Sequence, residues 1–254
     1  MLDTVPEVTA FFWIVKVLAT TVGETATDLL SDRLGLGLTN TTYLMAFLLA
    51  VALAFQLGAR GYVPGIYWIT VVLISIVGTL ITDNLVDRYN VSLRTTTILF
   101  SIALALTFAV WHLVEKTLSI HKIDTTRREA FYWLAILFTF ALGTAAGDLI
   151  AESLNVGYWK SALLVAGAIG VIAVAYYVFK LNEIVAFWCA YILTRPLGAS
   201  LGDYFSQKRV DGGLQWGTIT TSAVFLVAIL LVVIYLSVSR RDQPSVELSA
   251  RFEP

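Results

Sequence analysis

Eight apolar segments of about 20 residues alternate with short polar connections along the chain. A helix of about 20 residues is long enough to cross the hydrocarbon core of a bilayer. The pattern therefore predicts eight transmembrane helices, near residues 10–31, 38–58, 66–87, 94–114, 129–152, 158–180, 184–206 and 216–237. Because the number of crossings is even, both termini are expected on the same side of the membrane.

The composition changes this picture little and excludes several classes of protein. Of the 254 residues, 58% are hydrophobic and 14% charged, whereas soluble domains carry about 25% charged residues. We interpret the chain as an all-α membrane protein without a substantial soluble domain. A net charge of −1 does not suggest a nucleic-acid partner, and the single Cys189 excludes an intramolecular disulfide. Asp3 and Glu7 precede the first basic residue, Lys16, so a cleaved signal peptide is not expected.

A tryptophan, a glycine ten residues later and an aspartate five residues beyond it recur four times. The sets are Trp13/Gly23/Asp28, Trp68/Gly78/Asp83, Trp133/Gly143/Asp148 and Trp188/Gly198/Asp203. The glycines lie 55, 65 and 55 residues apart, which indicates a doubled pair of repeats offset by 120. We expect one membrane domain: a first repeat pair (1–114), a connecting loop (115–128), a second pair (129–239) and a polar tail (240–254).

Each repeat holds two predicted helices, a motif helix and a plainer partner, so all four motif helices run in the same direction. The repeats are then parallel and pseudo-symmetric about the membrane normal. Fifteen residues place each tryptophan about 22 Å from its aspartate along the helix. The tryptophans are expected as interfacial anchors near the cytoplasm, and the aspartates lie together toward the far face. Nine basic residues on the side of the termini against six opposite favour cytoplasmic termini.

This arrangement resembles a bacterial family of integral membrane proteins built from four tandem repeats of unknown function. Each repeat of that family has two transmembrane segments and a characteristic tryptophan, matched here by Trp13, Trp68, Trp133 and Trp188. The resemblance covers nearly the whole chain. It implies an eight-helix fold and carries no activity with it.

Carboxylates inside apolar segments are costly, and each is by default a hypothesis for a functional site. Residues four apart share a helix face, which groups Lys16, Glu24 and Asp28. The motif helices then present an inner tier of Asp28, Asp83, Asp148 and Asp203 and an outer tier of Asp32, Asp87, Glu152 and Gln207. Facing one another, these tiers would form an acidic funnel that attracts cations. Oxygen ligands suit hard divalent ions such as Mn²⁺, Mg²⁺ or Ca²⁺.

Four features qualify that hypothesis. Only His112 and His121 are available as imidazoles, which with one cysteine argues against zinc or copper. Clustered carboxylates could equally share protons, since like charges oppose ionisation of one another. Lys16 and Arg195 have no basic counterpart in the middle two motif helices and would tune the charge of the cluster. Pro196 follows Arg195 and predicts a kink, because proline removes a backbone donor.

Structural roles are the alternative for every residue of the motif. The glycines Gly23, Gly78, Gly143, Gly147, Gly198 and Gly202 are typical of close helix packing, or would open room for an ion beside the aspartate. The tryptophans could gate, and the outer tier could be solvated helix ends that pair with Arg33 and Arg88. The inner aspartates could bond hydroxyls that open the partner helices, namely Thr41, Thr42, Thr96, Thr97 and Ser161.

Catalysis is not expected. Gly147-Asp148 and Gly202-Asp203 resemble the end of the Gly-x-Gly-Asp motif of intramembrane aspartyl proteases, but Ala145 and Ser200 replace its first glycine. No metalloprotease, nucleophile-elbow or phosphate-binding motif is present.

The leading functional hypothesis is a transporter or exporter of a hard cation (Mn²⁺- or Mg²⁺-like) in the bacterial inner membrane, with proton coupling open. The four inner aspartates would bind or relay the ion, Glu24 would add a ligand, and Lys16 and Arg195 would tune the charge. A cofactor is not required, because the divalent cation is substrate; the partners are the lipid bilayer and the cation, with a homo-oligomer left open. The alternative is a membrane scaffold or assembly subunit whose aspartates and glycines hold helices together.

Overall fold

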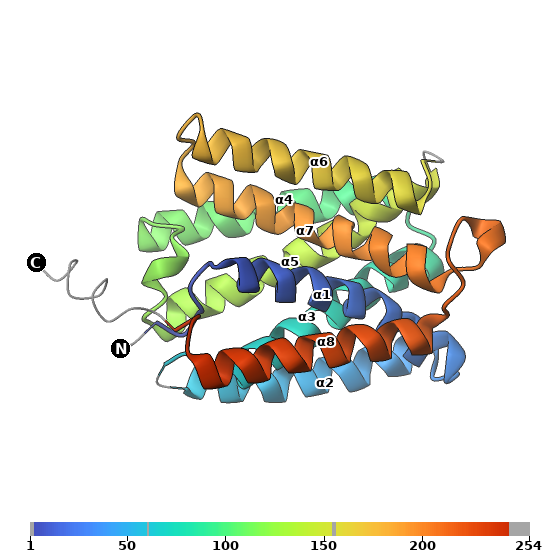
Figure 1. Ribbon diagram of the computed structural model, residues 1–254, viewed down its shortest axis with the longest axis horizontal. Helices are drawn as coiled ribbons and strands as arrows, with labels where there is room; N and C mark the ends of the chain where they lie inside the picture. The colour runs from blue at the N-terminus through green and yellow to red at the C-terminus, as the bar shows by residue number, and fades with distance from the viewer. Residues whose placement is uncertain (1–2, 60, 154–155, 244–254) are drawn as a thin grey trace, which may run out of the picture.

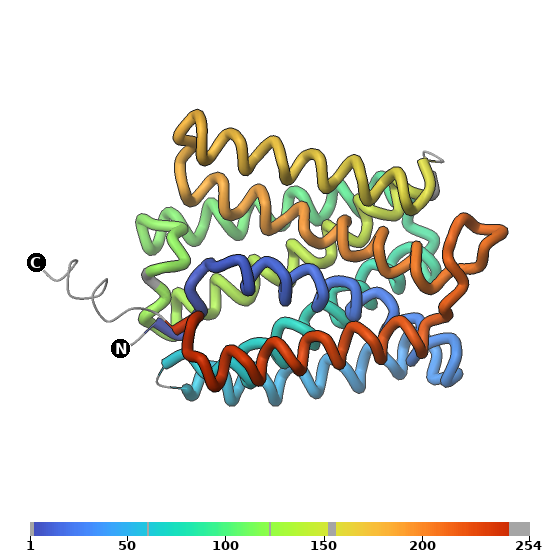
Figure 2. Tube along the Cα trace, viewed as in Figure 1, coloured from blue at the N-terminus to red at the C-terminus, as the bar shows by residue number. Residues whose placement is uncertain are grey.

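The computed structural model describes residues 3–59, 61–153 and 156–243, except for the side chains of residues 122, 152 and 153. Within these residues the chain forms eight long α-helices and no β-strand, which confirms the all-α fold. The helices are α1 (Ala10–Asp28), α2 (Gly37–Gly58), α3 (Pro64–Asp83), α4 (Leu93–Glu115), α5 (Thr126–Asp148), α6 (Tyr158–Tyr177), α7 (Glu183–Ser206) and α8 (Thr218–Ser239). They lie lengthwise beside one another and successive helices run in opposite directions, so α1, α3, α5 and α7 point the same way (Figures 1 and 2).

Local sequence signals fix where several helices begin. The hydroxyls of Thr9, Ser92 and Thr125 accept backbone N–H groups at the starts of α1, α4 and α5, and the Asn182 amide does the same for α7. Pro64 occupies the first turn of α3, where its missing N–H costs nothing. Short elements complete the chain: π-helical segments Leu29–Arg33, Asn84–Arg88 and Leu149–Ser153, and 3₁₀ turns Ile120–Lys122 and Arg209–Asp211.

Seven of the long helices among the described residues are long and apolar enough to cross a membrane. The exception is α1, because Lys16, Glu24, Asp28 and four threonines dilute its apolar side chains. Most of the α1 side chains are buried between other helices, so protein surrounds this segment. All eight predicted helices are present, and seven of them, α1 excepted, are apolar enough to span a membrane, which is consistent with an all-α, multi-pass membrane protein.

The four motif helices form a closed ring. Each contacts its two neighbours, in the order α1, α3, α5, α7 and back to α1. The second helix of each repeat packs chiefly on the motif helix of the following repeat: α2 on α3, α4 on α5 and α6 on α7. The last helix, α8, closes the series by packing on α1. The repeats thus follow one another around an axis rather than standing as separate two-helix units.

The motif glycines set the spacing of this ring. A Cβ on Gly23 would collide with Ser75, on Gly78 with Phe140, on Gly143 with Arg195 and on Gly198 with Thr20. In every case the obstructing residue lies three positions before the glycine of the next repeat. Only glycine fits at these four contacts, which is the close packing expected of small residues in membrane helices. Gly147 and Gly202 are looser, with a Cβ 3.4 Å from Pro196 and 3.2 Å from Glu24 respectively.

Aromatic side chains at the other end of the ring also contact from each repeat to the next. The aromatic residue before each motif tryptophan touches the tryptophan of the next repeat. The ring-centroid distances are 5.7 Å for Phe12–Trp68, 5.5 Å for Tyr67–Trp133, 6.3 Å for Tyr132–Trp188 and 5.7 Å for Phe187–Trp13. Trp68, Trp133 and Trp188 are only 2%, 3% and 5% exposed. These three rings therefore pack between neighbouring motif helices and are not on the outer surface of the bundle; their predicted depth at the cytoplasmic interface stays a prediction.

Residues near the two ends of the chain cover the aromatic end. The backbone N–H of Glu7 donates to the Asp242 carbonyl (3.0 Å), and the Tyr62 hydroxyl donates to the Asp242 carboxylate (2.5 Å). Burial and this hydrogen bond raise the pKa of Tyr62, so its hydroxyl keeps its proton. Asp242 is itself buried. Within the expected polar tail from residue 240, Asp242 therefore packs against the bundle while Arg240, Arg241 and Gln243 are exposed, and residues 244–254 lie outside the described part.

The glycine contacts generate a direct stability prediction. Gly78→Ala should lower stability by about 1–3 kcal/mol, because the new methyl would overlap the Phe140 side chain and approach the backbone of Ala141. Gly167→Ala on α6 is the matched control, since nothing lies within 4 Å of its added methyl. Thermal unfolding of the purified protein in detergent measures both. Equal melting temperatures for the two variants would contradict glycine-limited packing of the ring.

Candidate cation site

Arg195 on α7 lies at the centre of the ring and contacts all three other motif helices. Its side chain is fully buried. One terminal nitrogen donates to the Thr20 carbonyl on α1 (2.9 Å). The other donates to the hydroxyls of Thr79 on α3 and Thr144 on α5, the latter at 2.7 Å. A single guanidinium therefore ties the four repeats together.

Glu24 on α1 is the charged partner of this arginine. Its Oε2 lies 2.7 Å from the Arg195 guanidinium, and the Glu24 residue is 8% exposed. The pair joins the first and last repeats across the ring closure. Helix α7 continues through Pro196, so the ring is not interrupted beside the arginine.

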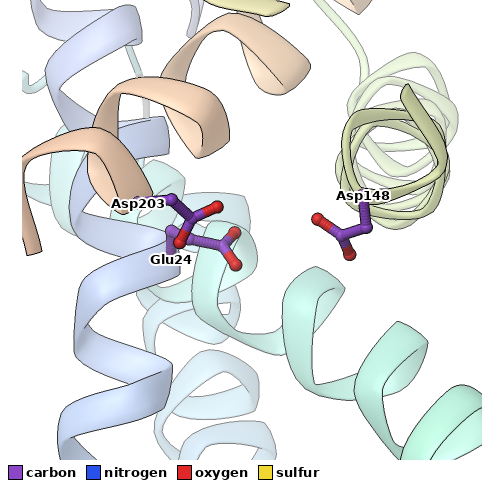
Figure 3. A group of neighbouring side chains, drawn as sticks. All are labelled: Glu24, Asp148 and Asp203. Carbon is purple, nitrogen blue, oxygen red and sulfur yellow. The ribbon is translucent and has the colours of Figure 1, made fainter. Parts of the chain in front are cut away.

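Three carboxylates converge next to this ion pair. Glu24 from α1, Asp148 from α5 and Asp203 from α7 point toward a common region (Figure 3). One oxygen from each lies within 4.8 Å of the others, a spacing that could hold a metal ion. Glu24 and Asp203 are buried and Asp148 is half-buried. Carboxylate oxygens at this spacing are the ligand type that hard divalent cations prefer.

The four inner aspartates are not equivalent, contrary to the sequence prediction. Asp148 and Asp203 join Glu24 in the three-carboxylate group, whereas Asp28 and Asp83 are outside it among the described residues. Asp83 is half-buried and lies within electrostatic range of Glu24, Asp148 and Asp28. The repeats also differ next to these aspartates, because only the first has a glutamate at the Glu24 position, where the Arg195 guanidinium of α7 donates to it.

A π-helical segment begins directly after three of the four motif aspartates, Asp28, Asp83 and Asp148. Helix α7 instead remains α-helical past Asp203 to Ser206. An i→i+5 segment widens the helix locally and redirects the side chains around it, and such segments occur often at functional sites. The backbone thus changes at the level of the carboxylates in three repeats.

Lys16 lies along the same axis, toward the aromatic end. It is fully buried, and its Nζ sits 3.7 Å from the ring centre of Phe140 and 4.1 Å from that of Tyr191. The ammonium has no hydrogen-bond partner among the described residues. It is therefore separate from the carboxylates that it was expected to neutralise, and aromatic faces are its nearest favourable contacts.

The outer tier is less organised. Asp32 and Asp87 are exposed, and the side chain of Glu152 lies outside the described residues. Asp32 accepts from Ser31 (3.1 Å) and Arg88 donates to Thr39, so the expected local pairs with Arg33 and Arg88 are not among the described ion pairs. Gln207 ends α7 as its C-terminal cap.

The alternative in which partner-helix hydroxyls bind the aspartates finds no support at those hydroxyls. Thr41 and Ser161 have no hydrogen-bond partner in the described structure. Thr42, Thr96 and Thr97 donate to carbonyls of their own helices.

Sequence reasoning missed the threonines and tyrosines of the axis. Thr79 and Thr144 occupy the motif position of Glu24 in the second and third repeats, four residues before each aspartate. Aligning the four repeats at that position shows one glutamate, two threonines and one alanine, Ala199, so the difference between the repeats is visible in the sequence although their contact with Arg195 is not. Tyr67 and Tyr132, directly before two motif tryptophans, also belong to the axis and form a hydrogen bond of 2.5 Å.

Comparison with known proteins identifies the repeat and little else. A family model described as Repeat of Unknown Function (DUF347) matches four tandem segments, residues 11–62, 66–117, 131–182 and 186–242. Each segment covers one motif helix of the ring and the helix that follows it in the chain. No curated protein and no solved structure matches significantly.

The contacts of Arg195 predict that loss of the arginine alone lowers the stability strongly, and that loss of Glu24 in addition restores part of it. Arg195→Gln should lower stability by about 3–5 kcal/mol, because it leaves the Glu24 carboxylate buried beside other carboxylates without its cation. Adding Glu24→Gln should recover part of that loss. Arg209→Gln in the exposed turn serves as control. Melting temperatures in detergent are measured for the wild type, Arg195→Gln, the double variant and Arg209→Gln. An Arg195→Gln variant that melts at the wild-type temperature would contradict the stabilising role of the arginine.

Proposed function

The chain belongs to the DUF347 repeat family, whose description leaves the function open, and we propose that it transports a hard cation through the ring of motif helices. The observation that carries the proposal is the convergence of Glu24, Asp148 and Asp203 from three different motif helices. We assign Mn²⁺ or Mg²⁺ as the substrate class, because every candidate ligand is a carboxylate oxygen.

The energetic cost of the carboxylate group supports a functional reading. Three carboxylates and one guanidinium lie together among buried and half-buried side chains. Packing alone would be better satisfied by apolar side chains, since buried ionised groups are expensive even when paired. Carboxylate oxygens that converge from three helices are the ligand set that a hard divalent cation prefers.

The Arg195 guanidinium competes with an entering cation for the Glu24 carboxylate. Its guanidinium occupies Glu24 in the present arrangement, with a second set of bonds to Thr79 and Thr144. An entering cation competes with the guanidinium for the Glu24 carboxylate, whereas the threonine hydroxyls can retain the arginine. The cation can therefore be released again when Arg195 returns to Glu24.

Exposed carboxylates provide an approach to this site. Asp32 and Asp87 follow the motif aspartates by four residues and lie close enough to influence each other electrostatically. Negative charge at the mouth of a low-dielectric site raises the local concentration of cations. Asp28 and Asp83 lie between the exposed and inner groups along their helices.

We propose further that the ring axis follows the membrane normal in a bacterial inner membrane, with both ends of the chain in the cytoplasm. The excess of basic residues in the connections on the side of the termini supports this orientation. The acidic group then lies toward the opposite face.

A scaffold role is the second candidate, and the contacts of Arg195 and the motif glycines favour it. Both sets of contacts join all four repeats and would be needed in a protein that transports nothing. The scaffold reading differs from transport in one respect: its aspartates contribute only to folding.

Flux measurements with paired variants test the proposal. Purified protein in liposomes should take up Mn²⁺ or Mg²⁺, and Asp148→Asn and Asp203→Asn should abolish uptake while remaining folded, because each loses a charged ligand. Asp211→Asn, in an exposed turn, is the matched control and should transport normally. Melting temperatures are recorded for each protein.

Two outcomes would contradict transport through the carboxylate site. One is a folded wild-type protein that moves neither ion. The other is normal uptake by both aspartate variants. Variants that unfold, combined with a wild-type protein that moves no ion, would favour the scaffold.

A further inference from the structure

A buried carboxylate at the aromatic end of the ring takes no part in the proposed cation site. Glu129 lies in the first turn of α5 and is 3% exposed. Its Oε1 accepts from the Gln56 amide of α2 (2.9 Å) and from the Trp133 indole (3.3 Å), and both donors are neutral. Hydrogen bonds thus hold the carboxylate, whereas none of the described ion pairs balances its charge.

The basic residues directly before Glu129 in the chain are engaged elsewhere. Arg127 and Arg128 both bond the Glu115 carboxylate, and Arg128 also bonds Asp124 (2.9 Å). The N-terminus of α5 favours a negative group in its first turn, but it supplies only about half a unit of positive charge. A buried carboxylate without a full counter-charge is costly. A cation or a proton must therefore supply the remainder.

Gln56 adds a second oxygen beside Glu129 that lacks a partner. It is fully buried near the end of α2. Its amide nitrogen donates to the Glu129 carboxylate and to the Thr4 carbonyl (3.3 Å), which accounts for both of its N–H groups. Its Oε1 accepts no hydrogen bond among the described residues. A buried acceptor without a donor is costly, and turning the amide over would sacrifice both bonds of the nitrogen.

The segment before α1, residues 3–9, brings further oxygens to the same place. It is not helical, and its backbone bonds Tyr62 between α2 and α3 (3.1 Å) and Ile123 between α4 and α5 (3.4 Å). Within it Thr4 is buried; its carbonyl accepts from the α2 amide, and its hydroxyl lies beside the Glu129 carboxylate. A carbonyl has two lone pairs, and carbonyls of non-helical segments coordinate Na⁺ in membrane transporters.

We propose that Glu129, Gln56 and Thr4 form a second cation site, which takes an alkali ion such as Na⁺ and fastens residues 3–9 to the ring. One carboxylate among neutral amide, carbonyl and hydroxyl oxygens carries a single negative charge, so a monovalent ion leaves the buried group neutral. A divalent ion would leave excess positive charge there. A proton is shared by two oxygens, whereas three residues contribute oxygens here. The second site does not depend on the proposed transport.

An ion in this position ties together three elements that are distant in sequence. Glu129 belongs to a motif helix, Gln56 to the outer helix α2, and Thr4 to the segment that covers the aromatic end. They lie at the end of the bundle where α1 and α5 begin (Figure 1). A ligand that binds only the folded arrangement stabilises it increasingly with concentration. The ion should therefore stabilise the fold and hold residues 3–9 in place.

Thermal unfolding in different salts tests the site. The purified protein in detergent is melted in NaCl, KCl, MgCl₂ and N-methyl-D-glucamine chloride at equal ionic strength. NaCl or KCl should raise the melting temperature by several degrees over the organic salt, in a saturable way. The rise should vanish in Glu129→Gln, which removes the charge of the site. Glu183→Gln is the matched control, because Glu183 lies in the first turn of α7 with its side chain 64% exposed.

Thiol labelling tests the fastening of residues 3–9 and decides the question if Glu129→Gln does not fold. Val5 is 3% exposed and is changed to cysteine in a chain whose native thiol is removed by Cys189→Ser. Na⁺ or K⁺ should slow the reaction of Val5→Cys with a maleimide several-fold relative to the organic cation. Cys189 of the wild-type protein is exposed and is the control, because its labelling rate should be the same in every salt.

Three results would overturn the second site. One is a melting temperature and a Val5→Cys labelling rate that do not differ between alkali and organic salts. Another is a Na⁺ response of wild-type size in folded Glu129→Gln. The third is a rise in MgCl₂ that exceeds the rise in NaCl and disappears in Glu129→Gln. Absence of Mn²⁺ and Mg²⁺ uptake with an intact Na⁺ response would count against the proposed transport and leave the second site standing.

Discussion

One buried guanidinium holds the centre of this protein. Arg195 bonds the Thr20 carbonyl, the Glu24 carboxylate and the hydroxyls of Thr79 and Thr144, so that all four repeats meet at one positive charge. Such a charge is tolerable inside a membrane protein only when its donors find good acceptors. The close approach that brings these acceptors within reach depends on the glycines, because Gly143 leaves room for the arginine side chain itself. The hydrogen bonds of the buried guanidinium therefore depend on the close packing of the motif helices.

The cyclic order of the repeats explains why the site is asymmetric although the fold is nearly symmetric. The glycine contacts, the aromatic contacts and the outer helices all follow one rule, in which each repeat packs on the next. That rule places the last repeat against the first, and Arg195 against Glu24. Glu24 occurs at its motif position in the first repeat alone and Arg195 at its position in the last repeat alone, and the site that contains them has one ion pair and three convergent carboxylates. The glycine and aromatic motif positions make the same contacts in all four repeats.

Much of the fold was predictable from the sequence, because hydrophobic length and the Trp–Gly–Asp spacing are local signals. They indicated the helices, the repeats and a packing role for Gly23 and its equivalents. The structure departs where three-dimensional neighbours matter. Trp68 packs between neighbouring motif helices, a contact that residue spacing does not predict, and among the described residues Asp28 and Asp83 fall outside the carboxylate group that includes Glu24. Neither the cyclic shift that pairs Arg195 with Glu24 nor the π-helical segments leave a mark in residue spacing alone.

The central claim is that Arg195 and an external cation compete for Glu24. A crystal structure of the wild-type protein soaked in Mn²⁺, with anomalous data collected at the manganese edge, tests it most directly. We expect an anomalous peak between Glu24, Asp148 and Asp203, with the guanidinium withdrawn from Glu24 and still bonded to Thr79 and Thr144. An unoccupied carboxylate group at saturating Mn²⁺, with the ion pair of Arg195 and Glu24 unchanged, would contradict the claim.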